Sequence, residues 1–204
     1  HVRILVGDEA LAAIGDVPLP PYITTALADP ERYQTVYARR PGSVAAPTAG
    51  LHLTTALLDR LGQRGIAVVA VELVVGLDTF KPVTVADPAD HRMHSERYHV
   101  PATTMEACRD ARRVVAVGTT TVRALEAAAA TGELSGRTRL FIRRPYEWRV
   151  VDVVLTNFHL PRTTLLMMID AFIGPRWRAL YETALADGYR FLSFGDAMLV
   201  ERTA

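Results

Sequence analysis

The clearest pattern of apolar and polar positions lies at residues 113–130, RVVAVGTTTVRALEAAAA. Val114, Val115 and Val117 are β-branched and typical of a buried strand, and the alanine-rich residues 122–130 favour a helix. Gly118 marks a tight turn between them. Because the first N–H groups of a helix have no partner in the helix, Thr119 to Thr121 indicate a binding position for an anion or a polar ligand. The alternative is that one threonine only caps the helix.

The same alternation of strand-like and helix-like segments continues along the chain. Strands are predicted at 2–6, 66–75, 95–100, 139–142, 150–155 and 189–199, and helices at 8–14, 53–61, 103–112, 165–172 and 176–186. The run at 66–75 is apolar apart from Glu72, so we expect a strand covered on both faces. Thr103 and Glu106 form the pattern of a capping box. The expected fold class is therefore α/β, with a mostly parallel sheet covered by helices.

In such a sheet, polar loops gather at one edge. The loops expected there are 47–52, 76–82, 118–121 and 156–161.

Composition narrows the class of protein. The 204 residues are 50% hydrophobic, which indicates a globular domain with a substantial core. With 23 basic and 22 acidic residues, the formal charge of +1 neither requires nor excludes a nucleic acid. Cys108 has no second cysteine to pair with, which excludes an internal disulfide and a cysteine zinc site. Without an apolar run of about 18 residues or a signal-peptide pattern, we expect a cytoplasmic protein that does not enter a membrane.

Basic residues concentrate at 137–149, where five arginines accompany one glutamate, Tyr146 and Trp148. Arginines beside aromatic rings suit an RNA backbone and an unstacked base. A solvated arginine face is the alternative.

Three histidines are candidates for chemistry. His94 and Glu96 lie two residues apart, so on a strand they face the same way and form either a proton-transfer pair or a structural pair. His52 lies at a helix start, where it either contacts a ligand or caps its own helix. His159 and Asn157 share a loop, where they either read a base or ribose or hold the loop in place. His91 and His94 lack further ligands at convincing spacing, so we expect no metal.

Seven ordered stretches together resemble one family. They are VPLPPYI, ERYQTVYARRPGSVAAPTAGLHLT, DTFKPV, HRMHSERY, AVGTTTVRALE, LTNFHLPRTTLLMM and YRFLSFGDAML, from about Val17 to Val200. They are similar to the S-adenosylmethionine:tRNA ribosyltransferase-isomerases of queuosine biosynthesis. The resemblance implies transfer and isomerisation of the ribosyl group of S-adenosylmethionine onto 7-aminomethyl-7-deazaguanine in a tRNA with a GUN anticodon. Epoxyqueuosine-tRNA, adenine and methionine would be the products.

The resemblance also implies roles for residues in these motifs. A general base removes a proton beside the sulfonium, an anion site holds the methionine carboxylate, and a donor assists the departure of adenine. The expected residues are His94, Glu96 and His159 for catalysis; Thr119, Thr120, Arg123 and Asn157 for S-adenosylmethionine; and Thr48, His52, Thr79, Arg144 and Tyr146 for the other substrate. S-adenosylmethionine is the co-substrate, and a monomer without metal is expected.

The chain departs from the family at several points. The family usually has LHVGxGTF, whereas residues 73–80 here read LVVGLDTF, so both the His and the Gly before Thr79 are replaced. Pro145 stands where the family has Gly. A diverged, non-catalytic paralogue that binds a nucleoside or RNA is therefore the alternative function. An unrelated α/β hydrolase would need a nucleophile and base pair that the sequence does not offer. The family carries an inserted β-barrel domain that nothing here supplies, so we expect residues 1–204 to be the larger, catalytic-type domain, part of a longer chain that begins before His1.

Overall fold

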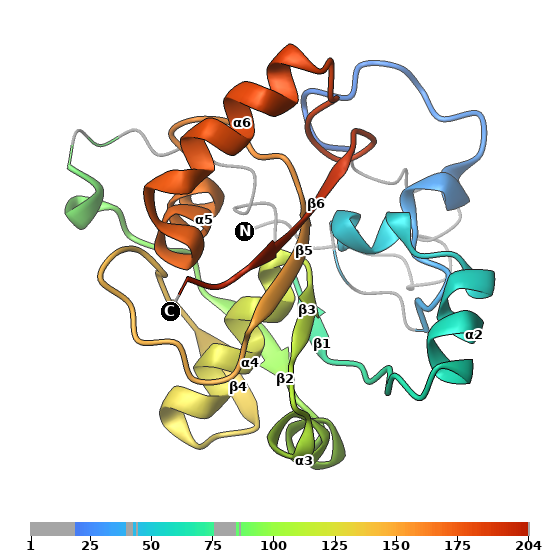
Figure 1. Cartoon of the computed structure of the whole chain (residues 1–204), viewed down its shortest axis with the longest axis vertical. Coiled ribbons are helices and arrows are strands. Elements are labelled where there is room, and N and C mark those ends of the chain that lie inside the picture. Colours follow the sequence, from blue (N-terminus) through green and yellow to red (C-terminus); the bar gives the residue numbers. More distant parts are fainter. Residues whose placement is uncertain (1–18, 40–42, 44, 76–84, 86, 204) are drawn as a thin grey trace, which may run out of the picture.

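The computed structural model describes residues 19–39, 43, 45–75, 85 and 87–203 (Figure 1). In these ranges the chain is mixed α/β. Its helices are α2 (Thr55–Gln63), α3 (Ala102–Asp110), α4 (Thr119–Thr131), α5 (Thr164–Ile173) and α6 (Trp177–Ala186). Its strands are β1 (Glu72–Val74), β2 (Glu96–His99), β3 (Val115–Val117), β4 (Ser135–Thr138), β5 (Val153–Asn157) and β6 (Ala197–Glu201). The strand predicted at 2–6, the helix at 8–14 and the loop at 76–82 lie outside the described residues.

The described strands form two three-stranded sheets, in the orders β1-β2-β4 and β3-β5-β6. In the first sheet both pairings are antiparallel, with Glu96 opposite Thr138 and Arg97 opposite Arg137. In the second, β3 and β5 are parallel, whereas β5 and β6 are antiparallel. The mostly parallel sheet is therefore not confirmed for these strands, since only one of the four pairings is parallel. The apolar pattern indicates where strands form, with the differences in extent given below, but it carries no information on their direction.

Helix α4 lies at the centre of the molecule and packs against strands of both sheets (Figure 1). Val122, Ala124 and Leu125 are buried in the main apolar core, which also includes residues of β3, β5, α5 and α6. A helix that is buried all round belongs in a core. Gly132 ends it at φ 77°, as the sequence predicts.

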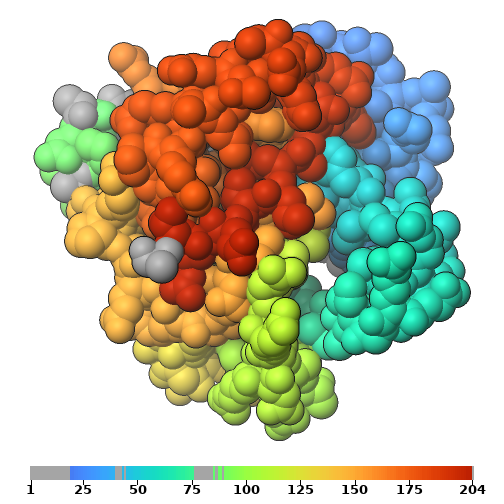
Figure 2. Space-filling model, viewed as in Figure 1, coloured from blue at the N-terminus to red at the C-terminus, as the bar shows by residue number. Residues whose placement is uncertain are grey.

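The apolar run at 66–75 is not a covered strand. Regular strand structure is confined to Glu72–Val74, and Ile66, Val68 and Val69 are 49%, 57% and 48% exposed. Figure 2 shows an open gap between the teal segment around α2 and the yellow-green region of β3 and α3. The hydrophobic pattern identifies residues that favour burial, but within the described residues nothing covers them.

Several boundaries also differ from the sequence pattern. Helix α3 has Pro101 at its N-cap without a side-chain capping bond, so the predicted capping box does not form. Residues 139–142 are not a strand, because β4 lies earlier, at Ser135–Thr138. No helix in the described part of the chain is long and apolar enough to cross a membrane.

Candidate functional site

His94 and Glu96 form the predicted pair at the start of β2. His94 Nε2 lies 2.8 Å from Glu96 Oε1. The Glu96 side chain is 1% exposed, whereas the His94 side chain is 18% exposed. A buried carboxylate that is hydrogen-bonded to Nε2 fixes the orientation of the imidazole. Of the two residues, His94 is thus the one that reaches accessible space.

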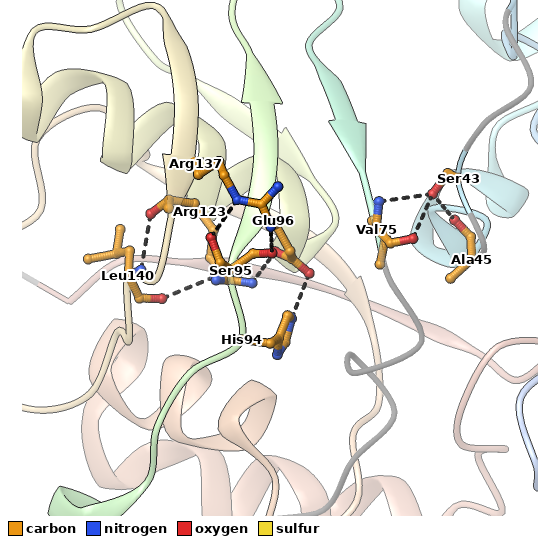
Figure 3. A network of polar contacts seen from close by, with 10 residues as sticks. Ser43, Ala45, Val75, His94, Ser95, Glu96, Arg123, Arg137 and Leu140 are labelled. Atoms are coloured by element: carbon orange, nitrogen blue, oxygen red, sulfur yellow. Dashed lines mark hydrogen bonds and ion pairs between the residues drawn. The ribbon is translucent and has the colours of Figure 1, made fainter. Parts of the chain in front are cut away.

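Arg123, from the first turns of α4, neutralises Glu96 from the other side. Its Nη1 donates to Glu96 Oε2, and its Nε donates to the Leu140 carbonyl at 3.1 Å (Figure 3). Burial lowers the pKa of the Arg123 guanidinium, and the negative charge of Glu96 opposes that shift. Because residues 96 and 123 are far apart in the chain, no local sequence pattern indicated this ion pair.

One nitrogen of Arg123 is left without a partner. Arg123 is only 4% exposed, and its buried Nη2 has no hydrogen bond to the described residues. A buried donor without a partner costs free energy. This nitrogen is therefore available to an acceptor on a ligand.

The N-terminus of α4 contributes further donors. Its N-cap is Gly118 at φ 90°, and no side chain caps the helix. Thr121 Oγ1 donates to the Val117 carbonyl at 2.8 Å, so the alternative in which a threonine caps α4 is wrong. The N–H groups at the start of the helix carry a partial positive charge and point to where an anion would be stabilised.

A small pocket brings these groups together. Its lining comprises Met93, His94, Glu96, Thr119, Thr120, Arg123, Leu140, Phe141, Ile142, Thr164, Leu165 and Met168. We call this set the His94 pocket. Its enclosed volume of about 20 Å³ accommodates roughly one water molecule, so most of any larger ligand would lie outside the enclosed part.

The His94 pocket unites five of the residues expected at the site. They are His94, Glu96, Thr119, Thr120 and Arg123. Sequence reasoning missed the contributions of Phe141 and of the start of α5, where Thr164 and Leu165 line the pocket. The TTLLMM stretch after Pro161 had been assigned only to a helix, capped by Thr163 or Thr164. Thr163 is the N-cap, and its hydroxyl accepts from Leu166 N at 3.2 Å.

A second group of expected residues lies at the end of β5. His52 Nε2 is 2.8 Å from Asn157 Oδ1, and Asn157 Nδ2 donates to Thr48 Oγ1 at 3.1 Å. We call these three residues the Asn157 cluster. His52 does not cap the following helix, because Thr54 does so through Leu57 N.

The turn between β3 and α4 separates the two groups. Gly118 N donates to the Leu155 carbonyl at 2.9 Å, so the turn is held beside β5. A Cβ on Gly118 would lie 3.6 Å from the Ala49 Cβ, so the segment of the Asn157 cluster abuts this turn. The carboxyl ends of β3 and β5, the parallel pair, thus meet where open α/β sheets place ligands. The predicted gathering of the loops at 47–52, 118–121 and 156–161 is confirmed.

His159 does not line the His94 pocket. Its Nε2 lies 3.1 Å from Thr156 Oγ1, and its backbone N–H donates to the Tyr181 hydroxyl at 3.0 Å. Burial lowers the pKa of His159 to about 4. The imidazole is therefore neutral near pH 7, in surroundings that include the rings of Phe158 and Tyr181.

Arg144 and Tyr146 also have partners away from the pocket. Arg144 makes two hydrogen bonds to Asp170, at 2.6 Å and 3.0 Å. The Tyr146 hydroxyl donates to Glu126 at 3.3 Å, and burial together with the Glu126 charge raises the pKa of Tyr146. Thr79 lies outside the described residues.

Metal binding receives no support from the described residues. Among them, no group of three or more His, Cys, Asp or Glu side chains is placed to hold an ion.

Comparison with known proteins gives a consistent result. A family model described as "Queuosine biosynthesis protein" matches residues 1–200. The chain is similar to proteins named S-adenosylmethionine:tRNA ribosyltransferase-isomerase. It is 55% identical to that of Synechococcus elongatus over 93% of this chain and 55% of the relative. It is 56% identical to that of Thermus thermophilus over 93% of this chain and 57% of the relative.

One solved structure is also similar. It is an S-adenosylmethionine tRNA ribosyltransferase from Thermotoga maritima, 43% identical, with a TM-score of 0.62 over 74% of this chain and 50% of that chain. The present chain therefore spans little more than half the length of the relatives that it matches.

Proposed function

We infer the function from one premise, which is that the chain belongs to the queuosine biosynthesis protein family. We propose that these 204 residues are the α/β catalytic-type part of a longer S-adenosylmethionine:tRNA ribosyltransferase-isomerase. The reaction would transfer and isomerise the ribosyl group of S-adenosylmethionine onto 7-aminomethyl-7-deazaguanine in tRNA, with epoxyqueuosine-tRNA, adenine and methionine as products. A tRNA with a GUN anticodon, a monomeric state and a cytoplasmic location belong to the same proposal.

One observation carries this proposal: the His94 pocket combines a histidine base with an anion site. Hydrogens on the ribose C5′ are acidified by the adjacent sulfonium, so a base is needed there. His94 would accept that proton, because Glu96 is buried and already paired with Arg123. Glu96 would position the imidazole and stabilise it after protonation, as a carboxylate does for a catalytic histidine.

The methionine end of the substrate would occupy the anion site. The free N–H groups of α4 beside Thr119 and Thr120, together with Arg123 Nη2, suit a carboxylate. These donors lie in the same pocket as His94. The carboxylate and the proton to be removed would therefore be held at the same pocket.

The Asn157 cluster would bind the adenine or ribose. Carboxamide and imidazole groups can donate to and accept from a base edge or a hydroxyl. Asn157 is 4% exposed and is held from both sides by Thr48 and His52, so its amide is already oriented. Asn157 is better placed than His159 to assist the departing adenine, because it lies beside the β3–α4 turn.

Mass spectrometry of the tRNA product tests this function. The chain, and in parallel a full-length relative, would be incubated with S-adenosylmethionine and tRNA carrying the 7-aminomethyl-7-deazaguanine precursor. Formation of epoxyqueuosine by this chain supports the proposal. If the relative forms product and this chain binds S-adenosylmethionine without forming any, residues 1–204 do not carry the activity by themselves.

The second candidate is a diverged paralogue that binds a nucleoside or RNA without catalysis. Asp78 and Pro145, which differ from the family pattern, favour it. Replacing both by glycine in a full-length protein with this sequence distinguishes the two functions. Product that appears only after replacement supports the paralogue, and product before replacement contradicts it.

A further inference from the structure

The outward face of the first sheet carries two arginines directly opposite each other. Arg97 of β2 pairs in register with Arg137 of β4, and both residues are exposed. Paired residues in an antiparallel sheet have side chains on the same face, close enough to interact. Like charges at such positions are unfavourable unless something compensates for them.

Neither arginine is neutralised by an ion pair within the described residues. Arg137 donates to Ser95 Oγ and to the Ser95 carbonyl, both at 3.0 Å (Figure 3). These contacts hold the guanidinium in place without cancelling its charge. For Arg97, no hydrogen bond or salt bridge to another described side chain is found. Two positive charges thus lie side by side on an exposed surface, and that of Arg137 is held in place by Ser95.

The arginines line a shallow depression of about 540 Å³, which we call the Arg97 face. It is formed by Glu72, Val74, Arg97, Tyr98, His99, Ser135, Gly136 and Arg137. His99 Nδ1 lies 2.6 Å from Ser135 Oγ. With two arginines and one glutamate, the face has an excess of positive charge and suits an anionic partner.

The Arg97 face lies on the side of β2 opposite to Glu96, because the exposed Arg97 alternates with the buried Glu96 along the strand. The two regions meet at the start of β2, at Ser95. Ser95 binds Arg137 and lies between His94 and Glu96 in the chain. Figure 3 shows Arg137 and Ser95 beside the Glu96 network. A long anionic polymer that follows the Arg97 face to the start of β2 would therefore pass close to the proposed reaction centre. A small anion bound to the same face would not reach it.

We propose that the Arg97 face binds the sugar-phosphate backbone of the substrate RNA, with Arg97 and Arg137 each contacting a phosphate. This assignment rests on the proposed function, which requires a tRNA. Arginine forks match phosphate oxygens, and such contacts position an RNA without reading its sequence. An RNA that follows this face to the start of β2 would reach Ser95 and, next to it in the chain, His94.

Titration of tRNA at several salt concentrations tests this assignment. An unmodified tRNA transcript would be bound to the wild-type chain, to R97Q/R137Q and to R97K/R137K. R60Q/R64Q, which removes two exposed arginines from the region of α2, is the matched control. Thermal melting checks folding, and calorimetry with S-adenosylmethionine reports the proposed function separately.

R97Q/R137Q should weaken tRNA binding about tenfold or more and make the slope of log K against log salt shallower by roughly 1.5. R97K/R137K should keep the slope, since the charges remain, and R60Q/R64Q should change neither quantity. Equal tRNA binding by R97Q/R137Q and wild type, or no tRNA binding by the wild-type chain, would overturn the assignment. If the assignment fails but every protein still binds S-adenosylmethionine, the proposed function stands. If no protein binds S-adenosylmethionine, the result counts against the proposed function itself.

Discussion

His94 is the residue on which the proposed chemistry depends most directly. Replacing it by Ala should lower turnover roughly 10²- to 10⁴-fold, because a general base typically contributes that much. The affinity for S-adenosylmethionine should change little, since the anion site at α4 remains. Steady-state kinetics and calorimetry separate the two quantities.

A second substitution at the same position separates basicity from positioning. His94→Gln keeps a donor to Glu96 but has no basic nitrogen, so it should be as inactive as His94→Ala. Turnover at the wild-type level in either variant would remove His94 as the base.

The burial of His159 predicts that the stability of the folded chain depends on pH. Its pKa is about 4 in the folded chain, against 6.5 as the ordinary value, because burial disfavours the charged form. Between these values the unfolded state binds more protons, so the free energy of unfolding rises with pH. The stabilising contribution of His159 is thus fully present above about pH 6.5 and is lost as the pH falls toward 4. The free energy of unfolding falls by about 3 kcal/mol in total over this range.

Urea unfolding across this pH range measures the effect. His159→Gln should show a smaller loss of stability on acidification than the wild type, whereas the exposed control His99→Gln should follow the wild type. Identical pH profiles for His159→Gln and wild type would show that His159 does not carry this dependence.

At the scale of elements, the β3–α4 turn connects the His94 pocket to the Asn157 cluster. Gly118→Ala should destabilise the chain by about 1–2 kcal/mol, because φ 90° is unfavourable for any residue with a Cβ. The added Cβ would meet its neighbours only at ordinary contact distances, so backbone strain is the cause. Thermal or urea unfolding measures the loss.

The matched control is Gly62→Ala in α2, where a Cβ would meet nothing within 4 Å. It should be neutral or stabilising by about 0.5–1 kcal/mol. If Gly118→Ala were equally harmless, the turn would not need its left-handed backbone.

Glu126 of α4 holds the backbone of residues 149–151 in place. Its buried carboxylate accepts from the backbone N–H groups of Arg149, Val150 and Val151, each at 3.0 Å. Glu126→Gln turns an NH₂ group toward some of these donors and should cost roughly 1–3 kcal/mol. Hydrogen exchange at the amides of 149–151 should accelerate.

Glu147 in the same loop provides the comparison, because its side chain is 88% exposed. Glu147→Gln should change stability by less than about 0.5 kcal/mol. Unaltered exchange at 149–151 in Glu126→Gln would contradict the role given to Glu126.

At the scale of the whole molecule, local patterns predicted elements better than their arrangement. The join of β3 to α4 and the pairing of His94 with Glu96 followed from short-range spacing. The Glu96–Arg123 ion pair and the contribution of α5 to the pocket did not, because they join segments far apart in the chain. The mostly parallel sheet was predicted but not confirmed for the same reason, since strand direction depends on which strands become neighbours.

The segment at 66–69 shows a second limit. Its apolar residues predicted a covered strand, whereas they are exposed in the described chain. Periodicity reports what a residue prefers, not what is present to pack against it. Conversely, the resemblance to a family identified residues of the His94 pocket before their geometry was known.

A crystal structure of this chain with S-adenosylmethionine tests the central claim most directly. We predict the methionine carboxylate at the start of α4, within hydrogen-bonding distance of Arg123 Nη2. The ribose C5′ should lie about 3–3.5 Å from a nitrogen of His94, the separation expected of a reactive arrangement. A carboxylate bound elsewhere, or a C5′ beyond the reach of His94, would contradict the account.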